Sequence, residues 1–149
     1  MKKKLKRQVT ETSNRYRSGL EERIAKQLEL LNVPFEYETI KIKYTKPLQD
    51  STYTPDFIIL KNGIFVEAKG QFQTSDRKKH RQIREQHGNK FDIRFVFSNP
   101  NQRIGKKSKT TYAMWCNRYN FKWAKGDIPK EWLKENGNKK RNKVASNSL

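Results

Sequence analysis

Asp56, Glu67 and Lys69 lie in two runs of strand-forming residues, where a need for solubility does not explain their charges. Asn62-Gly63 separates the runs and favours a two-residue hairpin turn, which places Asp56 opposite Lys69 and Ile58 opposite Glu67. Because side chains alternate along a strand, the two acids and the lysine then project from one face. A three-residue loop would instead put Asp56 on the other face.

Two carboxylates on one face of a hairpin are close enough to share a hard cation such as Mg²⁺, which prefers oxygen ligands. Hydrolysis of a phosphodiester requires a cation that neutralises charge at the phosphate, an activated water and a group that orients this water. We therefore expect Asp56 and Glu67 to hold Mg²⁺, for which Mn²⁺ substitutes, and Lys69 to orient the water. The competing interpretation is a charge pair on an exposed sheet face.

The overall charge points to a polyanionic partner. The chain has 149 residues, with 34 Lys or Arg against 15 Asp or Glu, so its net charge is +19 at pH 7. The longest apolar run, residues 57–60, is too short to span a membrane, and the basic start lacks the apolar region of a signal peptide. The single cysteine excludes an intramolecular disulfide and fits a reducing compartment. We expect an intracellular protein that binds nucleic acid and no membrane.

The charge pattern divides the chain into three segments. Residues 1–17 and 134–149 are rich in basic residues and lack apolar periodicity, which is typical of a solvated arm and tail. The intervening residues 18–133 contain most of the apolar periodicity and have a length suited to one domain.

The apolar spacing within this domain predicts an alternation of helices and strands. A helix begins after Ser18, with Glu21 completing a capping box, and ends near Asn32. The elements expected after it are a long bulged strand over 35–44, hairpin strands over 53–60 and 64–69, a helix over 75–87, a strand over 91–97, a helix over 111–119, a strand over 121–124 and a helix over 127–135. This order predicts an α/β fold with a mixed central sheet flanked by helices, and a parallel crossover between residues 64 and 97.

Several short motifs occur in the order found in one known family. Pro55-Asp56 followed by Glu67-Ala68-Lys69 is the PD-(D/E)xK signature of restriction-endonuclease-like nucleases. It is accompanied by Arg17-Ser-Gly-Leu-Glu21, Phe35-Glu-Tyr-Glu38, Tyr53-Thr-Pro-Asp-Phe57, Asn62-Gly-Ile-Phe-Val-Glu67, Asp76-Arg-Lys-Lys-His80 and Ile83-Arg-Glu-Gln-His87. From about Arg17 to Trp132 the chain resembles the phage endonuclease I family of Holliday-junction resolvases.

The resemblance implies a restriction-endonuclease-like fold in which Glu21, Asp56, Glu67 and Lys69 are catalytic. Glu21 would join Asp56 and Glu67 in binding the metal, although its position also suits a helix-capping acid. The resemblance further implies an interwoven, domain-swapped homodimer, in which each site takes the early glutamate from one chain and the other three residues from its partner. The crossing segment would be residues 41–49.

Basic residues outside the acidic cluster are candidates for phosphate contacts, which position DNA without reading its sequence. The candidates are Arg17, Arg77, Lys78, Lys79, His80, Arg81, Arg84, Lys106 and Lys107. For the helix that carries most of them, the alternative is a solvated polar face. For His80, the alternative is a structural role.

These observations together predict a Mg²⁺-dependent endonuclease that binds branched DNA as a homodimer and cuts two strands near a four-way junction. If the chain is encoded by a phage, it would act in the cytoplasm of the infected host cell. Two alternatives remain. One is a non-enzymatic, basic nucleic-acid-binding protein, and the other is a PD-(D/E)xK endonuclease that cuts linear duplex DNA.

Overall fold

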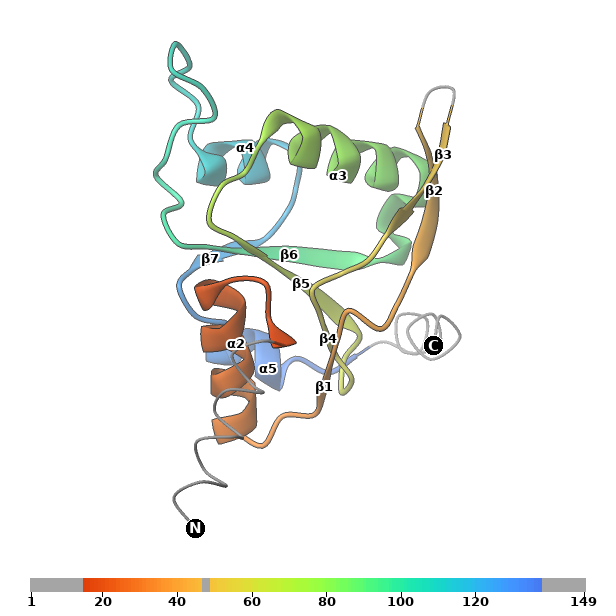
Figure 1. Ribbon diagram of the computed structural model, residues 1–149, viewed down its shortest axis with the longest axis vertical. Coiled ribbons are helices and arrows are strands. Elements are labelled where there is room, and N and C mark those ends of the chain that lie inside the picture. The colour runs from red at the N-terminus through yellow and green to blue at the C-terminus, as the bar shows by residue number, and fades with distance from the viewer. Residues whose placement is uncertain (1–14, 47–48, 138–149) are drawn as a thin grey trace.

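A five-stranded sheet forms the centre of the protein in the computed structural model, which describes residues 15–46 and 49–137 (Figure 1). In spatial order the strands are β1 (Phe35–Tyr37), β4 (Phe57–Ile59), β5 (Ile64–Lys69), β6 (Asp92–Phe97) and β7 (Trp123–Lys125). The pairs β1–β4 and β4–β5 are antiparallel, whereas β5–β6 and β6–β7 are parallel. The predicted α/β class, mixed sheet and parallel crossover are therefore confirmed.

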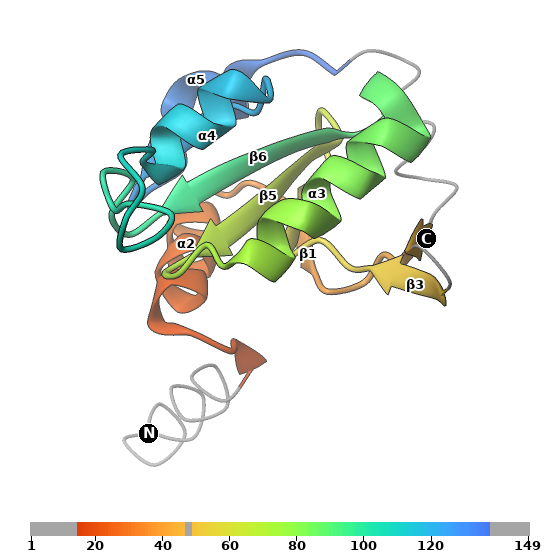
Figure 2. The ribbon, with the colours of Figure 1, turned by 90° about the horizontal axis from the view of Figure 1, so that it is seen from above.

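Helices cover both faces of this sheet (Figures 1 and 2). α3 (Thr74–His87) and α4 (Tyr112–Arg118) lie on one face, and α2 (Gly19–Leu30) and α5 (Lys130–Lys134) lie on the other. A short 3₁₀ turn, η1 (Gly88–Lys90), follows α3. Each face has its own apolar core, with Phe65 and Phe95 in one and Val66 and Val96 in the other. Because both faces are covered, β5 and β6 are apolar at consecutive positions.

The first helix begins as the sequence predicts. The Ser18 hydroxyl accepts the backbone N–H of Glu21 at 3.1 Å and thereby caps α2. Asn32 then adopts a left-handed conformation with a φ of 53°, and Pro34 follows, so the chain leaves the helix toward β1.

The hairpin between β4 and β5 has a longer loop than predicted. Ile59 pairs with Ile64, so residues 60–63 form a four-residue loop, and the predicted pairing of Asp56 with Lys69 is wrong. The side chain of Asn62 is buried and donates hydrogen bonds to the carbonyls of Trp132 and Glu135 at 2.9 and 3.1 Å. These bonds keep Asn62 out of the exposed two-residue turn that was predicted. A shift of two residues preserves side-chain alternation, so the predicted common face survives.

The long strand predicted over residues 35–44 is two strands in different sheets. Glu38 has a φ of 52°, which ends the extended backbone of β1. β2 (Ile42–Lys46) pairs instead with β3 (Gln49–Tyr53) in a separate antiparallel hairpin. The strand predicted over 53–60 divides in the same way at Pro55, between β3 and β4. In the described chain, β2, which forms most of the predicted crossing segment 41–49, thus pairs with the neighbouring strand of the same chain.

The folded part of the chain is slightly longer than predicted. The Tyr16 ring is buried in the core beside α2, and Glu135 forms an ion pair with the buried Arg94. Most of the predicted arm and tail lies outside the described residues. Across residues 15–46 and 49–137, no helix has both the length and the apolar character needed to cross a bilayer.

Candidate active site

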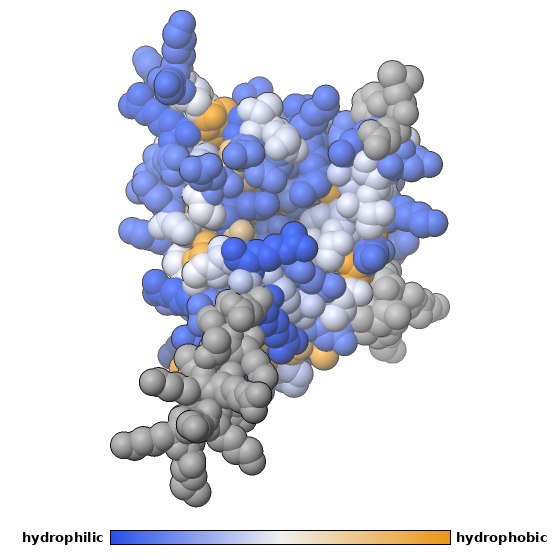
Figure 3. All heavy atoms as spheres, viewed as in Figure 1, coloured by the Kyte–Doolittle hydropathy of each residue, from blue (hydrophilic) through white to orange (hydrophobic). Residues whose placement is uncertain are grey.

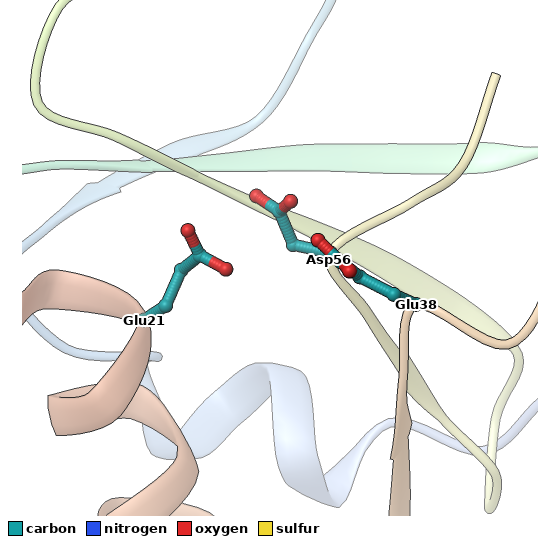
Figure 4. Close-up of side chains that lie close together, drawn as sticks. All are labelled: Glu21, Glu38 and Asp56. Atoms are coloured by element: carbon teal, nitrogen blue, oxygen red, sulfur yellow. The ribbon is translucent and has the colours of Figure 1, made fainter. Parts of the chain in front are cut away.

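The predicted catalytic residues converge beside the first turn of α2. Glu67 and Lys69 lie on β5, Asp56 directly precedes β4, and Glu21 lies in the first turn of α2. Carboxylate oxygens of Glu21, Asp56 and Glu38 lie within 4.8 Å of one another, and Figure 4 shows how the three side chains approach from different elements. In this structure one chain supplies the whole cluster.

The sequence analysis predicts no role for Glu38, although this residue belongs to one of the family-like motifs. Its backbone N–H donates to the Asp56 carbonyl at 3.1 Å, which joins the end of β1 to the start of β4. Its carboxylate pairs with the Arg17 guanidinium at 2.9 Å. A left-handed conformation at a residue other than glycine is uncommon and often marks a functional site. Only the folded backbone provides that signal.

Hydrogen bonds lock Asp56 and Glu67 together. Oε1 of Glu67 accepts the Tyr53 hydroxyl at 2.5 Å and the backbone N–H of Asp56 at 3.3 Å. In return, Oδ2 of Asp56 accepts the backbone N–H of Ala68 at 2.9 Å. Each acid is thus held by the backbone beside the other. Glu67 is almost fully buried, and Asp56 is partly buried.

Burial makes it costly for both acids to be ionised at once. Burial and the nearby charge of Glu67 raise the pKa of Asp56 to about 9, and burial also raises the pKa of Glu67. Without a cation, Asp56 therefore holds a proton at neutral pH. These carboxylates can all be ionised together only if a positive charge lies among them, and carboxylate oxygens are hard ligands. The cluster therefore fits a divalent cation, which Asp56, Glu67 and Glu21 would hold.

Lys69 provides a fixed positive charge at the edge of the cluster. Its ammonium group pairs with Asp76 at 3.2 Å, and both side chains are largely buried. Burial alone lowers the pKa of Lys69, but Glu67 and Asp76 outweigh burial and raise it. Lys69 is therefore protonated at neutral pH, so it can donate a hydrogen bond to water or phosphate but cannot accept a proton.

The predicted DNA-binding residues fall into two groups. The side chains of Arg17, Lys78, Arg81, Lys106 and Lys107 are exposed, and much of the face seen in Figure 3 is hydrophilic. Arg77, Lys79 and Arg84 are half-buried. Arg77 donates to the Phe72 carbonyl, and the Arg84 guanidinium lies 4.1 Å from the centre of the Phe121 ring.

His80 lies in the interior, which favours the structural alternative over the predicted phosphate contact. Its ring is fully buried, and the ring centres of Tyr53 and Phe95 lie 5.1 and 4.8 Å away. Neither ring nitrogen has a hydrogen-bond partner among the described residues. Burial, reinforced by Lys79 and Lys69, holds the pKa of His80 well below its usual value. The helical spacing shows only that His80 shares a face with Ile83, which is the buried side of α3.

Two basic features of the structure carry several of the predicted DNA-binding residues. A groove of about 520 Å³ separates α3 from the β2–β3 hairpin and includes Asp76, the partner of Lys69, together with Lys46, Lys78 and Lys79. The second feature, here termed the finger, comprises residues 99–111 and projects between β6 and α4 (Figure 1). A hydrogen bond of 2.9 Å from Ile104 to the Thr110 carbonyl closes its base.

A mixed sheet flanked by helices, with buried acids and a lysine at adjacent strands, is the arrangement implied by the resemblance to restriction-endonuclease-like nucleases. The sequence model described as Phage endonuclease I matches residues 1–148. Over 120 residues the chain is 50% identical to Endonuclease I of Escherichia phage T7. The aligned region covers 80% of this chain and 79% of that protein. It is 47% identical, also over 120 residues, to Endodeoxyribonuclease 1 of Enterobacteria phage T3, covering 80% and 78%. The chain belongs to the phage endonuclease I family.

Proposed function

We propose that this protein is a Mg²⁺-dependent DNA endonuclease that resolves four-way junctions by paired cuts. The observation that carries the proposal is the acidic cluster of Glu21, Asp56 and Glu38 beside the protonated Lys69. Glu67 joins this cluster by accepting the backbone N–H of Asp56. DNA as the substrate is supported by the name of the phage T3 relative and by the net charge of +19.

The four residues have separate roles in this proposal. Asp56 and Glu67 bind the cation, and Glu21 completes its carboxylate ligands. When bound, Mg²⁺ neutralises charge at the scissile phosphate and makes a water more acidic. Lys69 donates a hydrogen bond that orients this water or the phosphate oxygen, while Asp76 holds its ammonium group in place.

Paired cutting requires two sites, and we therefore propose that the protein acts as a homodimer. The β2–β3 hairpin lies between the segment with Glu21 and the segment with Asp56, Glu67 and Lys69. If the hairpin opened, two chains would exchange these segments and rebuild each site with the same contacts. Exchange of identical elements is an inexpensive route to a dimer.

Basic side chains of the groove and the finger, together with Arg17, are proposed to hold the phosphates of the junction arms. Lys78 and Lys79 line the groove next to Asp76, and Lys106 and Lys107 extend from the finger. Arg17 lies beside the acidic cluster through its ion pair with Glu38. Contacts of this kind orient a branched substrate without reading bases.

The test compares cleavage of a four-way junction with cleavage of a linear duplex of the same sequence, with Mg²⁺ or with EDTA. We expect Mg²⁺-dependent paired nicks in the junction and little cutting of the duplex, with no cutting by Glu67→Gln. Equal cutting of both substrates would favour the alternative linear-duplex endonuclease. Junction binding without cutting would favour the non-enzymatic alternative.

A further inference from the structure

Two buried tyrosines reach the acidic cluster from different strands. Tyr53, at the end of β3, donates its hydroxyl to Oε1 of Glu67 at 2.5 Å. Tyr37, at the end of β1, donates its hydroxyl to Oε2 of Glu21. Both aromatic rings are buried. The proposed chemistry gives neither hydroxyl a role.

The contacts of Tyr53 determine which oxygen of Glu67 faces the site. Oε1 accepts both the Tyr53 hydroxyl and the Asp56 N–H, whereas no described residue donates a hydrogen bond to Oε2. A carboxylate whose first oxygen is fixed in this way has lost its rotation, so the direction of its second oxygen is fixed as well. The Tyr53 ring is itself held by edge contact with His80 and by the Lys79 ammonium group, 5.8 Å from its centre.

Tyr37 holds Glu21 through a comparable chain of contacts. Its hydroxyl accepts the backbone N–H of Arg17 at 3.3 Å and donates to Glu21. Its ring packs between Tyr16 and Phe57, whose ring centres lie 4.7 and 5.2 Å away. A hydroxyl that accepts from the backbone has its hydrogen directed toward the carboxylate.

We propose that Tyr37 and Tyr53 are positioning residues, which orient Glu21 and Glu67 for the cation. This inference rests on the proposed function. Outer hydrogen bonds of this kind orient metal ligands, and their loss typically weakens metal affinity or activity by about 10–100-fold. Tyr37 precedes the β2–β3 hairpin, as Glu21 does, and Tyr53 ends that hairpin and leads to Glu67. The segment before the hairpin therefore carries both Glu21 and its tyrosine, and the segment that follows carries both Glu67 and its tyrosine. Each acid is oriented in the same way whether one chain or two chains build the site.

The test measures Mn²⁺ binding to the full-length protein without DNA, by calorimetric titration of Tyr37→Phe, Tyr53→Phe and a matched control. The control is Tyr16→Phe, because the Tyr16 ring packs against Tyr37 but its buried hydroxyl has no hydrogen-bond partner among the described residues. We expect Mn²⁺ affinity to fall about 10–100-fold in the first two variants and to stay unchanged in the control. The metal concentration for half-maximal junction cleavage should rise by the same factor.

Glu67→Gln separates the possible failures. If wild-type protein binds no Mn²⁺, or if Glu67→Gln binds it equally well, the proposed metal site fails and the inference fails with it. If Glu67→Gln loses binding while Tyr37→Phe and Tyr53→Phe keep wild-type affinity, only the inference is overturned. A lower unfolding temperature with unchanged Mn²⁺ affinity would also overturn it, because a purely structural role explains that result.

Discussion

At the residue scale, the acidic cluster is a place where catalysis and stability oppose each other. In the metal-free protein, burial and the neighbouring Glu67 keep a proton on Asp56 up to a pH of about 9. The unfolded chain releases that proton near pH 3.8, the ordinary value for aspartate. Between these values the folded state binds more protons than the unfolded state, so the free energy of unfolding falls as pH rises.

Asp56→Asn removes this cost, so we expect the metal-free variant to unfold at a higher temperature than wild type while losing cleavage. The increase in unfolding temperature should be larger at pH 8 than at pH 5. Each kcal/mol of added stability should raise that temperature by about 2–4 °C. Thermal unfolding in EDTA at both pH values measures it. Asp127→Asn is the control, because Asp127 is exposed and its carboxylate pairs with Arg23 at the surface. A variant no more stable than wild type at pH 8 would show that burial imposes no such cost.

His80 shows the opposite sign of pH dependence. Because burial holds its pKa far below the usual value of 6.5, the unfolded chain alone gains a proton as pH falls through 6.5. We expect His80→Leu to increase the free energy of unfolding by about 1–3 kcal/mol at neutral pH, because it removes buried nitrogens without partners.

The advantage of His80→Leu should grow as pH falls below 6.5, by at most about 1.4 kcal/mol per pH unit. Urea denaturation at pH 7.5 and pH 5.5 measures both effects. His87→Gln is the control, because the His87 ring lies at the surface, where it contacts the Lys43 carbonyl. Equal pH slopes for wild type and His80→Leu would contradict the prediction.

At the scale of elements, the finger and α3 place cations on the side of the sheet where β5 and β6 end. The finger has a base closed by backbone hydrogen bonds, and its exposed Lys106 and Lys107 stand between β6 and α4. An ordered loop presents its charges with a smaller entropic cost than a flexible one.

If Lys106 and Lys107 each contact a phosphate, replacing both with alanine should weaken binding to every DNA shape. The slope of log K against log salt should become shallower by about 0.9 per lost contact. Anisotropy titrations at several salt concentrations, in a Glu67→Gln background without cleavage, measure the slope. A double alanine variant of Lys61 and Lys90 is the control, since these lysines adjoin the other ends of β5 and β6. An equal loss of DNA affinity in the two double variants would contradict the prediction, because it would depend on net charge alone.

At the scale of the whole molecule, the question is whether two chains share each site. A heterodimer with Glu21→Ala in one chain and Asp56→Ala in the other distinguishes the arrangements. If the chains are interwoven, one site carries both lesions and the other is intact, so one strand is nicked but the junction is not resolved. If each chain builds its own site, both sites carry a lesion.

The heterodimer must be isolated with two different tags, and both parent homodimers must first be shown to be inactive. Supercoiled plasmid bearing a cruciform then reports nicking as open circles and paired cutting as linear product. An isolated heterodimer with no nicking above its parents would count against the interwoven dimer. It would leave the assignment of Asp56, Glu67 and Lys69 intact.

Features that depend on neighbouring residues were predictable before the fold was known. Side-chain alternation placed Asp56 and Glu67 on one face, and the capping pattern began α2 at Ser18. The face was predicted correctly although the loop was not, because an error of two residues preserves alternation. The α/β order followed from apolar periodicity in the same local way.

Features set by contacts between distant residues were not predictable in this way. Asn62 lengthens the hairpin loop because carbonyls some 70 residues later bind its side chain. The left-handed conformation of Glu38 brings a further acid to the site, and the burial of His80 among aromatic rings removes a predicted DNA contact. No local pattern encodes these outcomes, because each depends on which residues the fold brings together.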